Sequence, residues 1–252
     1  MLTRTAHDDQ VLEIRLDRPP VNALDPALVA ALRDAVRDAA GSGARAVVLS
    51  GAPGVFSAGL DVPVLLRLDR AEMASFWHDF VGLLEVIGRS PIPVVAAVTG
   101  HSPAGGAVLA LFCDYRVMAR GDFRIGLNEV QVGLPVPPVV QFALRRLVGA
   151  HRAERLMVAG AMVSPDEALR VGLVDELADV DLVVGQAVAW CRALLALPPA
   201  AMAETRRLAR ADLDAMLAEA GRGENPEFLE RWFGAEAQSL LRALVAALAS
   251  GR

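Results

Sequence analysis

The sequence predicts an α/β fold on three observations. Short apolar runs rich in β-branched residues alternate with longer stretches of helical period, as in chains that build a sheet from successive strand and helix units. The central stretch combines both patterns: Ile92–Val98 is typical of a buried strand, Thr99–Ala104 of a turn and Gly105–Cys113 of a buried helix. From about Asp181 to the C-terminus the pattern is helical.

The elements before the central stretch are indicated by alternation and by helix-start signals. Val11–Leu16 alternates apolar and polar residues, which predicts a strand. Asp25 is a typical N-cap and Pro26 a typical first helical residue, and the helical period continues over Ala27–Ala40. Arg45–Ser50 indicates a second, buried strand.

A long helix is expected at Ala71–Ile87, with Phe76, Phe80, Leu83, Leu84 and Ile87 on one face. Ser164 and Glu167 form a capping box around Pro165, which predicts a helix that ends at Gly172. The other expected elements are strands at Tyr115–Ala119, Asp122–Ile125 and Leu173–Leu177, and helices over 137–147, over Ala150–Val158 and from Asn225–Glu227 through Leu244.

Composition limits the classes of partner. The chain has 252 residues, of which 54% are hydrophobic and 22% charged, so it can bury a large core and is not disordered. The net charge is -5 without a basic block, which argues against nucleic acid as a partner. Cys113 and Cys191 lie far apart without metal-type spacing, and the first ten residues lack an apolar signal segment, so we expect reduced thiols and a cytoplasmic protein.

The apolar central stretch is open to three other interpretations. As a membrane span it would place Gly100–Pro103 at mid-bilayer, where these residues would break the helix, so no membrane association is expected. As a nucleophile elbow around Ser102 it fails because Pro103 lacks the N–H that the oxyanion hole of such an elbow requires. The third interpretation, a buried core whose glycines serve only close packing, stays open on these residues alone.

Three segments carry candidate chemistry: the apolar loop Ala58–Asp61, the helix start at Gly105, and Glu129 in a second apolar loop. Two backbone N–H groups that converge on one oxygen form an oxyanion hole. An apolar environment raises the pKa of a carboxyl group toward the range of a general base. The combination suits proton abstraction next to a carbonyl, although the first loop could equally be a tight connection under the next helix. No metal cluster, Ser-His-Asp set or phosphate-binding loop competes, and we expect His78 to be a surface or lining residue.

Four blocks in the order LDRPPVNAL, VFSAGLD, GHSPAGGAVLALFCDYR and GLNEVQVGL resemble the signature blocks of the crotonase (enoyl-CoA hydratase/isomerase) superfamily. The resemblance implies a spiral of β-β-α turns over residues 1–195, a helical trimerisation region over residues 196–252, and acyl-CoA thioesters as substrates. It also implies that the N–H groups of Leu60 and Gly105 form the oxyanion hole. The implied coenzyme A pocket is lined by Ala58, Gly59, Leu60, Asp61 and Gly105.

Within this superfamily the acidic residues decide the reaction. The hydratases resemble one another in carrying two glutamates, and the position of the first, three residues after the hole glycine, is Val108 in this sequence. Glu129 matches the second. This pattern most closely resembles the mitochondrial-type Δ3,Δ2-enoyl-CoA isomerases of fatty acid β-oxidation, in which one glutamate would move a proton from C2 to C4. Asn128 would either orient Glu129 or only hold its loop.

The resemblance further implies a homotrimer, or a dimer of trimers, and no cofactor beyond the coenzyme A of the substrate. Two alternatives stay open. The protein could catalyse another crotonase-type reaction, such as enoyl-CoA hydration, or it could be a non-catalytic acyl-CoA-binding subunit.

Overall fold

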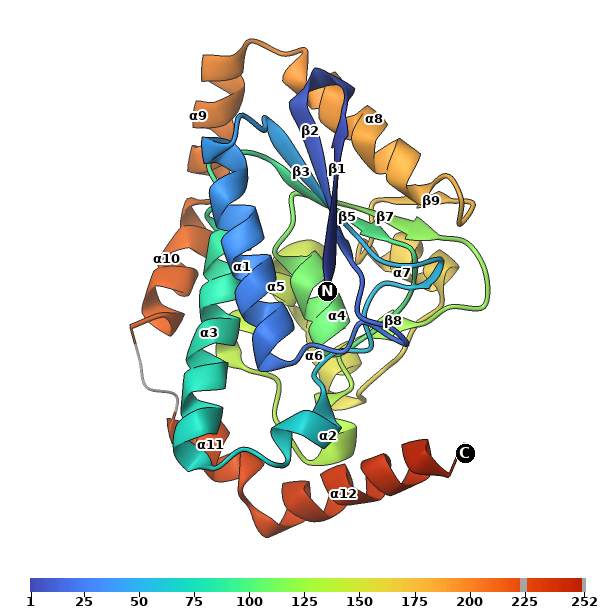
Figure 1. Ribbon diagram of the computed structural model, residues 1–252, viewed down its shortest axis with the longest axis vertical. Coiled ribbons are helices and arrows are strands. Elements are labelled where there is room, and N and C mark those ends of the chain that lie inside the picture. The colour runs from blue at the N-terminus through green and yellow to red at the C-terminus, as the bar shows by residue number, and fades with distance from the viewer. Residues whose placement is uncertain (223–225, 251–252) are drawn as a thin grey trace.

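Two sheets form the centre of the computed structural model, which describes residues 1–222 and 226–250 (Figure 1). The larger sheet has the order β1-β2-β3-β5-β7-β9 and the smaller one the order β4-β6-β8. β1 and β2 pair antiparallel, and the other adjacent strands pair parallel. The strands are β1 (Leu2–His7), β2 (Val11–Leu16), β3 (Ala46–Ser50), β4 (Gly54–Val55), β5 (Val94–Val98), β6 (Gly100–Pro103), β7 (Tyr115–Ala119), β8 (Ile125–Gly126) and β9 (Glu176–Ala178).

The chain passes from one sheet to the other in a repeated order. The strands β3, β5 and β7 of the larger sheet are followed directly by β4, β6 and β8 of the smaller one, and helices follow each pair. Gly54 pairs with Gly100 and Ser102 pairs with Ile125, so the small strands stack in register. This order is the β-β-α spiral that the resemblance to the crotonase superfamily implied.

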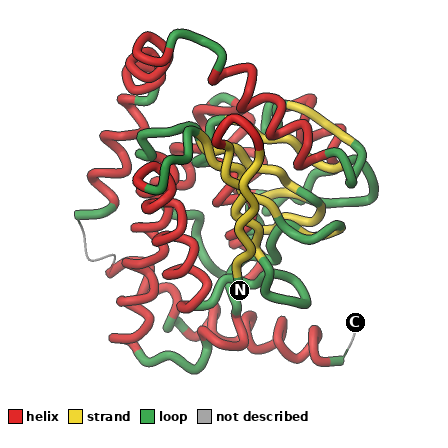
Figure 2. Tube along the Cα trace, turned by 45° about the horizontal axis from the view of Figure 1, so that its top comes forward, coloured by secondary structure: helices red, strands yellow, loops and turns green. Residues whose placement is uncertain are grey.

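Helices cover both faces of the larger sheet, and the strands lie between them (Figure 2). α8 contacts β3, β5 and β7 on one face, whereas α1 and α4 lie on the other face, and α3 packs on α1. The α-helices are α1 (Pro26–Gly41), α2 (Val62–Leu65), α3 (Arg70–Gly88), α4 (Gly105–Leu111), α5 (Pro138–Val148), α6 (Ala150–Val158), α7 (Pro165–Val171), α8 (Val183–Leu195), α9 (Pro199–Ala209), α10 (Ala211–Ala220), α11 (Pro226–Trp232) and α12 (Ala235–Ala249). Two 3₁₀ helices, η1 (Asp8–Gln10) and η2 (Glu129–Val132), complete the described residues.

The central strands β3 and β5 are apolar apart from Ser50, and both of their faces are buried. In β3, Val47 and Leu49 belong to the large hydrophobic core under α1 and α3, whereas Ala46 and Val48 belong to the smaller core under α8. Successive side chains of a strand point to opposite faces, so a strand that is covered twice shows a continuous apolar run instead of alternation.

Several predicted elements are confirmed. The strands Val11–Leu16 and Tyr115–Ala119 and the helix Ala150–Val158 have the predicted bounds. The carboxylate of Asp25 caps α1 by accepting a hydrogen bond from the N–H of Leu28 at 2.7 Å. The predicted apolar face of α3 is buried.

Other predictions were wrong for local reasons. β1 was missed because four of its six residues are exposed, so it has no apolar pattern. Ser164 caps α7, but the carboxylate of Glu167 pairs with Arg170 instead of completing a capping box. The strand expected at Leu173–Leu177 begins three residues later, as β9 at Glu176, because the chain first leaves α7 through a turn.

Three further differences concern short or terminal segments. The turn expected at Thr99–Ala104 contains β6, and the strand expected at Asp122–Ile125 is the two-residue strand β8. The last predicted helix is two helices, α11 and α12, separated at Gly234. Asn225, which was expected to start that helix, lies outside the described residues.

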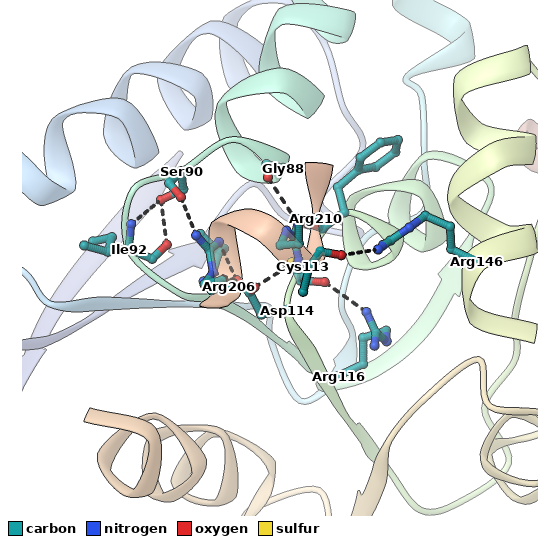
Figure 3. A network of polar contacts seen from close by, with 12 residues as sticks. Gly88, Ser90, Ile92, Cys113, Asp114, Arg116, Arg146, Arg206 and Arg210 are labelled. Carbon is teal, nitrogen blue, oxygen red and sulfur yellow. Dashed lines mark hydrogen bonds and ion pairs between the residues drawn. The ribbon is translucent and has the colours of Figure 1, made fainter. Parts of the chain in front are cut away.

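A buried carboxylate joins the C-terminal helices to the core (Figure 3). Asp114, whose side chain is 8% exposed, accepts two hydrogen bonds from Arg206 at 2.7 and 2.8 Å and one from Arg210 at 2.9 Å. The same guanidinium groups donate to the carbonyl oxygens of Ser90 and Phe112. α9 and α10 are therefore fixed to the segments that flank β5 and α4.

The predicted trimerisation region leaves some apolar surface uncovered. On α12, Leu240 is 39% exposed and Leu248 is 62% exposed. The trimer and the division of the chain at residue 195 stay predictions. In the part of the chain that the structure describes, no single helix is long and apolar enough to cross a membrane, although the bent pair α8 and α9 meets both criteria together.

We expect Asp114→Asn to lower the free energy of unfolding by about 3–5 kcal/mol, because two largely buried guanidinium groups would lose their anionic partner. The control is Asp212→Asn, which removes the 53% exposed partner of Arg146 and should lower it by less than about 1 kcal/mol. Urea denaturation of both variants measures the difference. Equal losses would contradict the anchoring role of Asp114.

Candidate active site

The loop before α2 and the start of α4 lie in direct backbone contact. Gly59 has a φ angle of +83°, and a Cβ atom on it would lie 3.0 Å from the Gly105 nitrogen and 3.1 Å from the Pro103 oxygen. A Cβ atom on Gly105 would lie 3.1 Å from the Cα of Gly59 and 3.3 Å from the nitrogen of Leu60. The two segments approach this closely because both positions are glycine.

This contact brings two free N–H groups together. The carbonyl of Gly59 accepts from the N–H of Leu24 at 2.8 Å, and the N–H of Asp61 donates to the carbonyl of Leu24 at 3.0 Å. Between these two bonds, the N–H of Leu60 has no acceptor among the described residues. The N–H of Gly105 has none either, because Gly105 is the first residue of α4. Two backbone N–H groups on neighbouring segments are thus left without a backbone acceptor among the described residues.

Buried polar side chains hold the first loop, and the sequence analysis missed them. The side chain of Asn22 accepts from the N–H of Arg18 at 2.9 Å and donates to the carbonyl of Phe56 at 3.0 Å. The hydroxyl of Ser57 donates to the carbonyl of Asn22 at 2.8 Å and accepts from the N–H of Gly59 at 3.2 Å. The signal in the sequence was the presence of these polar residues in otherwise apolar loops.

The turn into α4 is held in an unusual backbone conformation. Ala104 has φ 43° and ψ −116°, a region that is strained for an L-residue by about 1–3 kcal/mol. Its N–H donates to the carbonyl of Gly126 at 2.8 Å, and Pro103 pairs with Gly126 in the small sheet. These bonds bring the loop that carries Glu129 to the start of α4.

Glu129 is the first residue of η2. Its Oε2 atom is buried and has no hydrogen-bond partner within residues 1–222 and 226–250. Burial raises the pKa of this carboxyl group to about 7. α12 packs against η2 and the residue that follows it, since a Cβ atom on Gly133 would lie 3.1 Å from the Cα of Ala237.

The structure also places the other residues that the sequence analysis singled out. The side chain of Asn128 makes no hydrogen bond to Glu129 or to its own loop among the described residues, and its Oδ1 atom is buried without a partner, so both roles considered for Asn128 stay predictions. Val108 is buried in α4 with 3% of its surface exposed. His78 is exposed on α3, as expected. The described residues contain no group of three or more His, Cys, Asp or Glu side chains that could hold a metal ion.

Comparison with known proteins identifies the class. The family described as enoyl-CoA hydratase/isomerase matches residues 6–238, so this chain belongs to that crotonase family. Human mitochondrial enoyl-CoA delta isomerase 1 is 34% identical over 205 residues, which are 79% of this chain and 67% of that protein. A probable enoyl-CoA hydratase of Mycobacterium avium is 33% identical over 215 residues, which are 84% of this chain and 80% of that protein.

Solved structures agree with this assignment. The crystal structure of human mitochondrial Δ3-Δ2-enoyl-CoA isomerase matches with a TM-score of 0.94 and 28% identity, over 100% of this chain and 99% of that one. An enoyl-CoA hydratase of Mycobacterium ulcerans matches with a TM-score of 0.83 and 30% identity, over 90% of this chain and 99% of that one. The resemblance found in the sequence blocks is therefore confirmed, and the chain is similar to both isomerases and hydratases.

The close packing at the start of α4 predicts that alanine is tolerated less well at Gly106 than at Gly105. A Cβ atom on Gly106 would lie 2.4 Å from the carbonyl oxygen of Ser57, so Gly106→Ala requires a backbone shift and should lower the free energy of unfolding by about 2–3 kcal/mol. In Gly105→Ala the nearest contacts are 3.1–3.3 Å, and the loss should stay below about 1 kcal/mol because alanine favours the helix. Denaturant titration of both variants measures this order, and the reverse order would contradict the described contact.

Proposed function

We propose that this protein is a Δ3,Δ2-enoyl-CoA isomerase that converts 3-enoyl-CoA to trans-2-enoyl-CoA. The observation that carries the proposal is the buried carboxyl group of Glu129, which has an unpartnered oxygen and a pKa of about 7. Membership in the crotonase family and similarity to enoyl-CoA delta isomerases support an acyl-CoA thioester as the substrate.

The N–H groups of Leu60 and Gly105 would donate to the thioester oxygen of the substrate. When a proton leaves C2, its bonding electrons pass into a dienolate and the negative charge gathers on that oxygen. One preorganised donor stabilises such a charge by about 2.7–4 kcal/mol. Because these donors are backbone groups of two fixed segments, they need no rearrangement as the charge develops.

Glu129 would carry the proton in both steps. Its carboxylate removes a proton from C2, and the resulting carboxylic acid returns the proton to C4. The electron pair of the former C3–C4 double bond forms the new C4–H bond, and the double bond then lies between C2 and C3. A group with a pKa of about 7 suits this exchange, because it is a stronger base than an ordinary carboxylate and still ionises at neutral pH.

The residue at position 108 favours isomerisation over hydration. Adding water to a double bond requires a second acid or base that positions the water, and in the related hydratases we expect a glutamate there. Val108 is buried and apolar, so it offers no hydrogen bond to a water molecule. A single glutamate is sufficient when the proton that is removed is also the proton that is returned.

We expect Glu129→Gln to abolish isomerisation of trans-3-hexenoyl-CoA, with a loss of at least about 10³-fold in kcat, because glutamine has the same shape but cannot accept the proton. Binding of hexanoyl-CoA, which has no double bond to move, is the control and should stay within about threefold. Spectrophotometric turnover and calorimetric binding measure the two quantities. Turnover retained by this variant would mean that Glu129 is not the base.

The raised pKa also predicts how stability depends on pH. A carboxyl group with a folded-state pKa of about 7 and an ordinary value of 4.5 favours folding below pH 4.5, and this contribution is lost as the pH rises toward and through 7. Glutamine never ionises, so Glu129→Gln should be more stable than the unchanged protein by roughly 3 kcal/mol at pH 8 and nearly equal to it at pH 4.5. Thermal or urea unfolding at the two pH values measures the difference. A stability difference independent of pH would show that Glu129 is ionised without penalty.

A further inference from the structure

The guanidinium group of Arg18 lies where two loops meet beside Leu60. Its Nη2 atom is 2.7 Å from Asp61 Oδ2 and 3.0 Å from Asp25 Oδ2, and its Nη1 atom donates to the carbonyl of Ala23 at 3.1 Å. The side chains of Arg18, Asp25 and Asp61 are only 25%, 16% and 11% exposed. Because little water reaches these groups, solvent screens them less than a surface ion pair.

In both carboxylates, one oxygen atom pairs with a backbone N–H group and the other with Arg18. Oδ1 of Asp25 accepts from the N–H of Leu28 at the start of α1, and Oδ1 of Asp61 accepts from the N–H of Val64 at the start of α2. The Oδ2 atoms of both are left for Arg18. Each carboxylate is thus fixed by a helix N-terminus on one side, and a single guanidinium group joins the two helix starts on the other.

Leu60 lies between the atoms that this arrangement fixes. The residues before and after it, Gly59 and Asp61, are both hydrogen-bonded to Leu24. Leu24 is adjacent to Asp25, and Asp61 is adjacent to Leu60. The direction of the Leu60 N–H group therefore depends on how the 24–25 and 59–61 segments are held against each other.

We propose that Arg18 is a positioning residue of the active site, which holds the Leu60 N–H group in place by joining Asp61 to Asp25. This inference rests on the proposed function, because that function directs the Leu60 N–H toward the thioester oxygen. Arg18 acts indirectly, by fixing the two carboxylates. It thereby affects how well the Leu60 N–H group stabilises the negative charge that develops during the reaction. A displaced donor weakens binding of the transition state much more than binding of the ground state.

The test is Arg18→Lys. A lysine keeps the charge, but its single ammonium group on a flexible stem cannot reproduce the planar contacts to two carboxylates and a carbonyl. We expect kcat for trans-3-hexenoyl-CoA to fall about 10- to 100-fold while KM changes by less than about threefold. The pH midpoint of kcat/KM should stay near 7, because the surroundings of Glu129 are unchanged.

Arg33→Lys is the matched control. Arg33 is 22% exposed and pairs with Asp79, so it links α1 to α3 in the way that Arg18 links α1 to α2. Arg33→Lys should lower the free energy of unfolding by about as much as Arg18→Lys does, and it should leave kcat unchanged. Two outcomes would overturn the proposal: equal losses of kcat in both variants, or a pH midpoint in Arg18→Lys that moves toward the ordinary value of 4.5, which would indicate collapse of the site.

A binding measurement separates this proposal from the proposed function. Acetoacetyl-CoA ionises to an enolate that absorbs in the near ultraviolet, and its stabilisation requires the two N–H donors but no turnover. We expect Arg18→Lys to form about tenfold less enolate at a fixed pH, with binding of hexanoyl-CoA within about threefold. If the unchanged protein forms the enolate without isomerising 3-hexenoyl-CoA, the proposed function fails and the role of Arg18 is still tested. Equal enolate in both proteins, or none in the unchanged protein, would overturn the positioning role.

Discussion

The contact between Gly59 and Gly105 is the constraint on which the site depends. Two backbone segments from different turns of the spiral lie so close that a Cβ atom on either glycine would be within 3.1 Å of the other segment. Such contact leaves little room for side chains, so the groups that we propose face a ligand there are backbone N–H groups. The buried bonds of Asn22 and Ser57 and the strained turn at Ala104 all serve to hold this approach.

The site and the rest of the core make opposite contributions to stability. Burial of Glu129 without a partner for Oε2 opposes folding at neutral pH, and so does the strain at Ala104. The doubly covered sheet and the anchor at Asp114 contribute in the other direction, because they bury apolar surface and satisfy charges. These unfavourable features lie together at the proposed site, where the mechanism that we propose needs a basic carboxylate and a preformed pair of donors.

The sequence predicted the central strands and most of the helices, because buried strands and helix-start signals leave strong local patterns, whereas the spiral was implied by the resemblance of its motif blocks to the crotonase superfamily. It did not predict β1, whose pairing with β2 is set by backbone hydrogen bonds on a largely exposed edge. It also missed the network around Arg18, since Arg18, Asp25 and Asp61 become neighbours only when the spiral closes. Asp61 was expected to line the coenzyme A pocket, and in the structure its carboxylate caps α2 and pairs with Arg18.

The central claim is that one buried carboxylate and two backbone donors move a double bond and do not add water. The most direct test compares isomerisation of trans-3-hexenoyl-CoA with hydration of trans-2-hexenoyl-CoA by the same preparation of purified protein. We predict rapid isomerisation and hydration slower by at least about 100-fold, because Val108 cannot position the water. Hydration as fast as isomerisation, or hydration alone, would contradict the account and show that position 108 does not select the reaction.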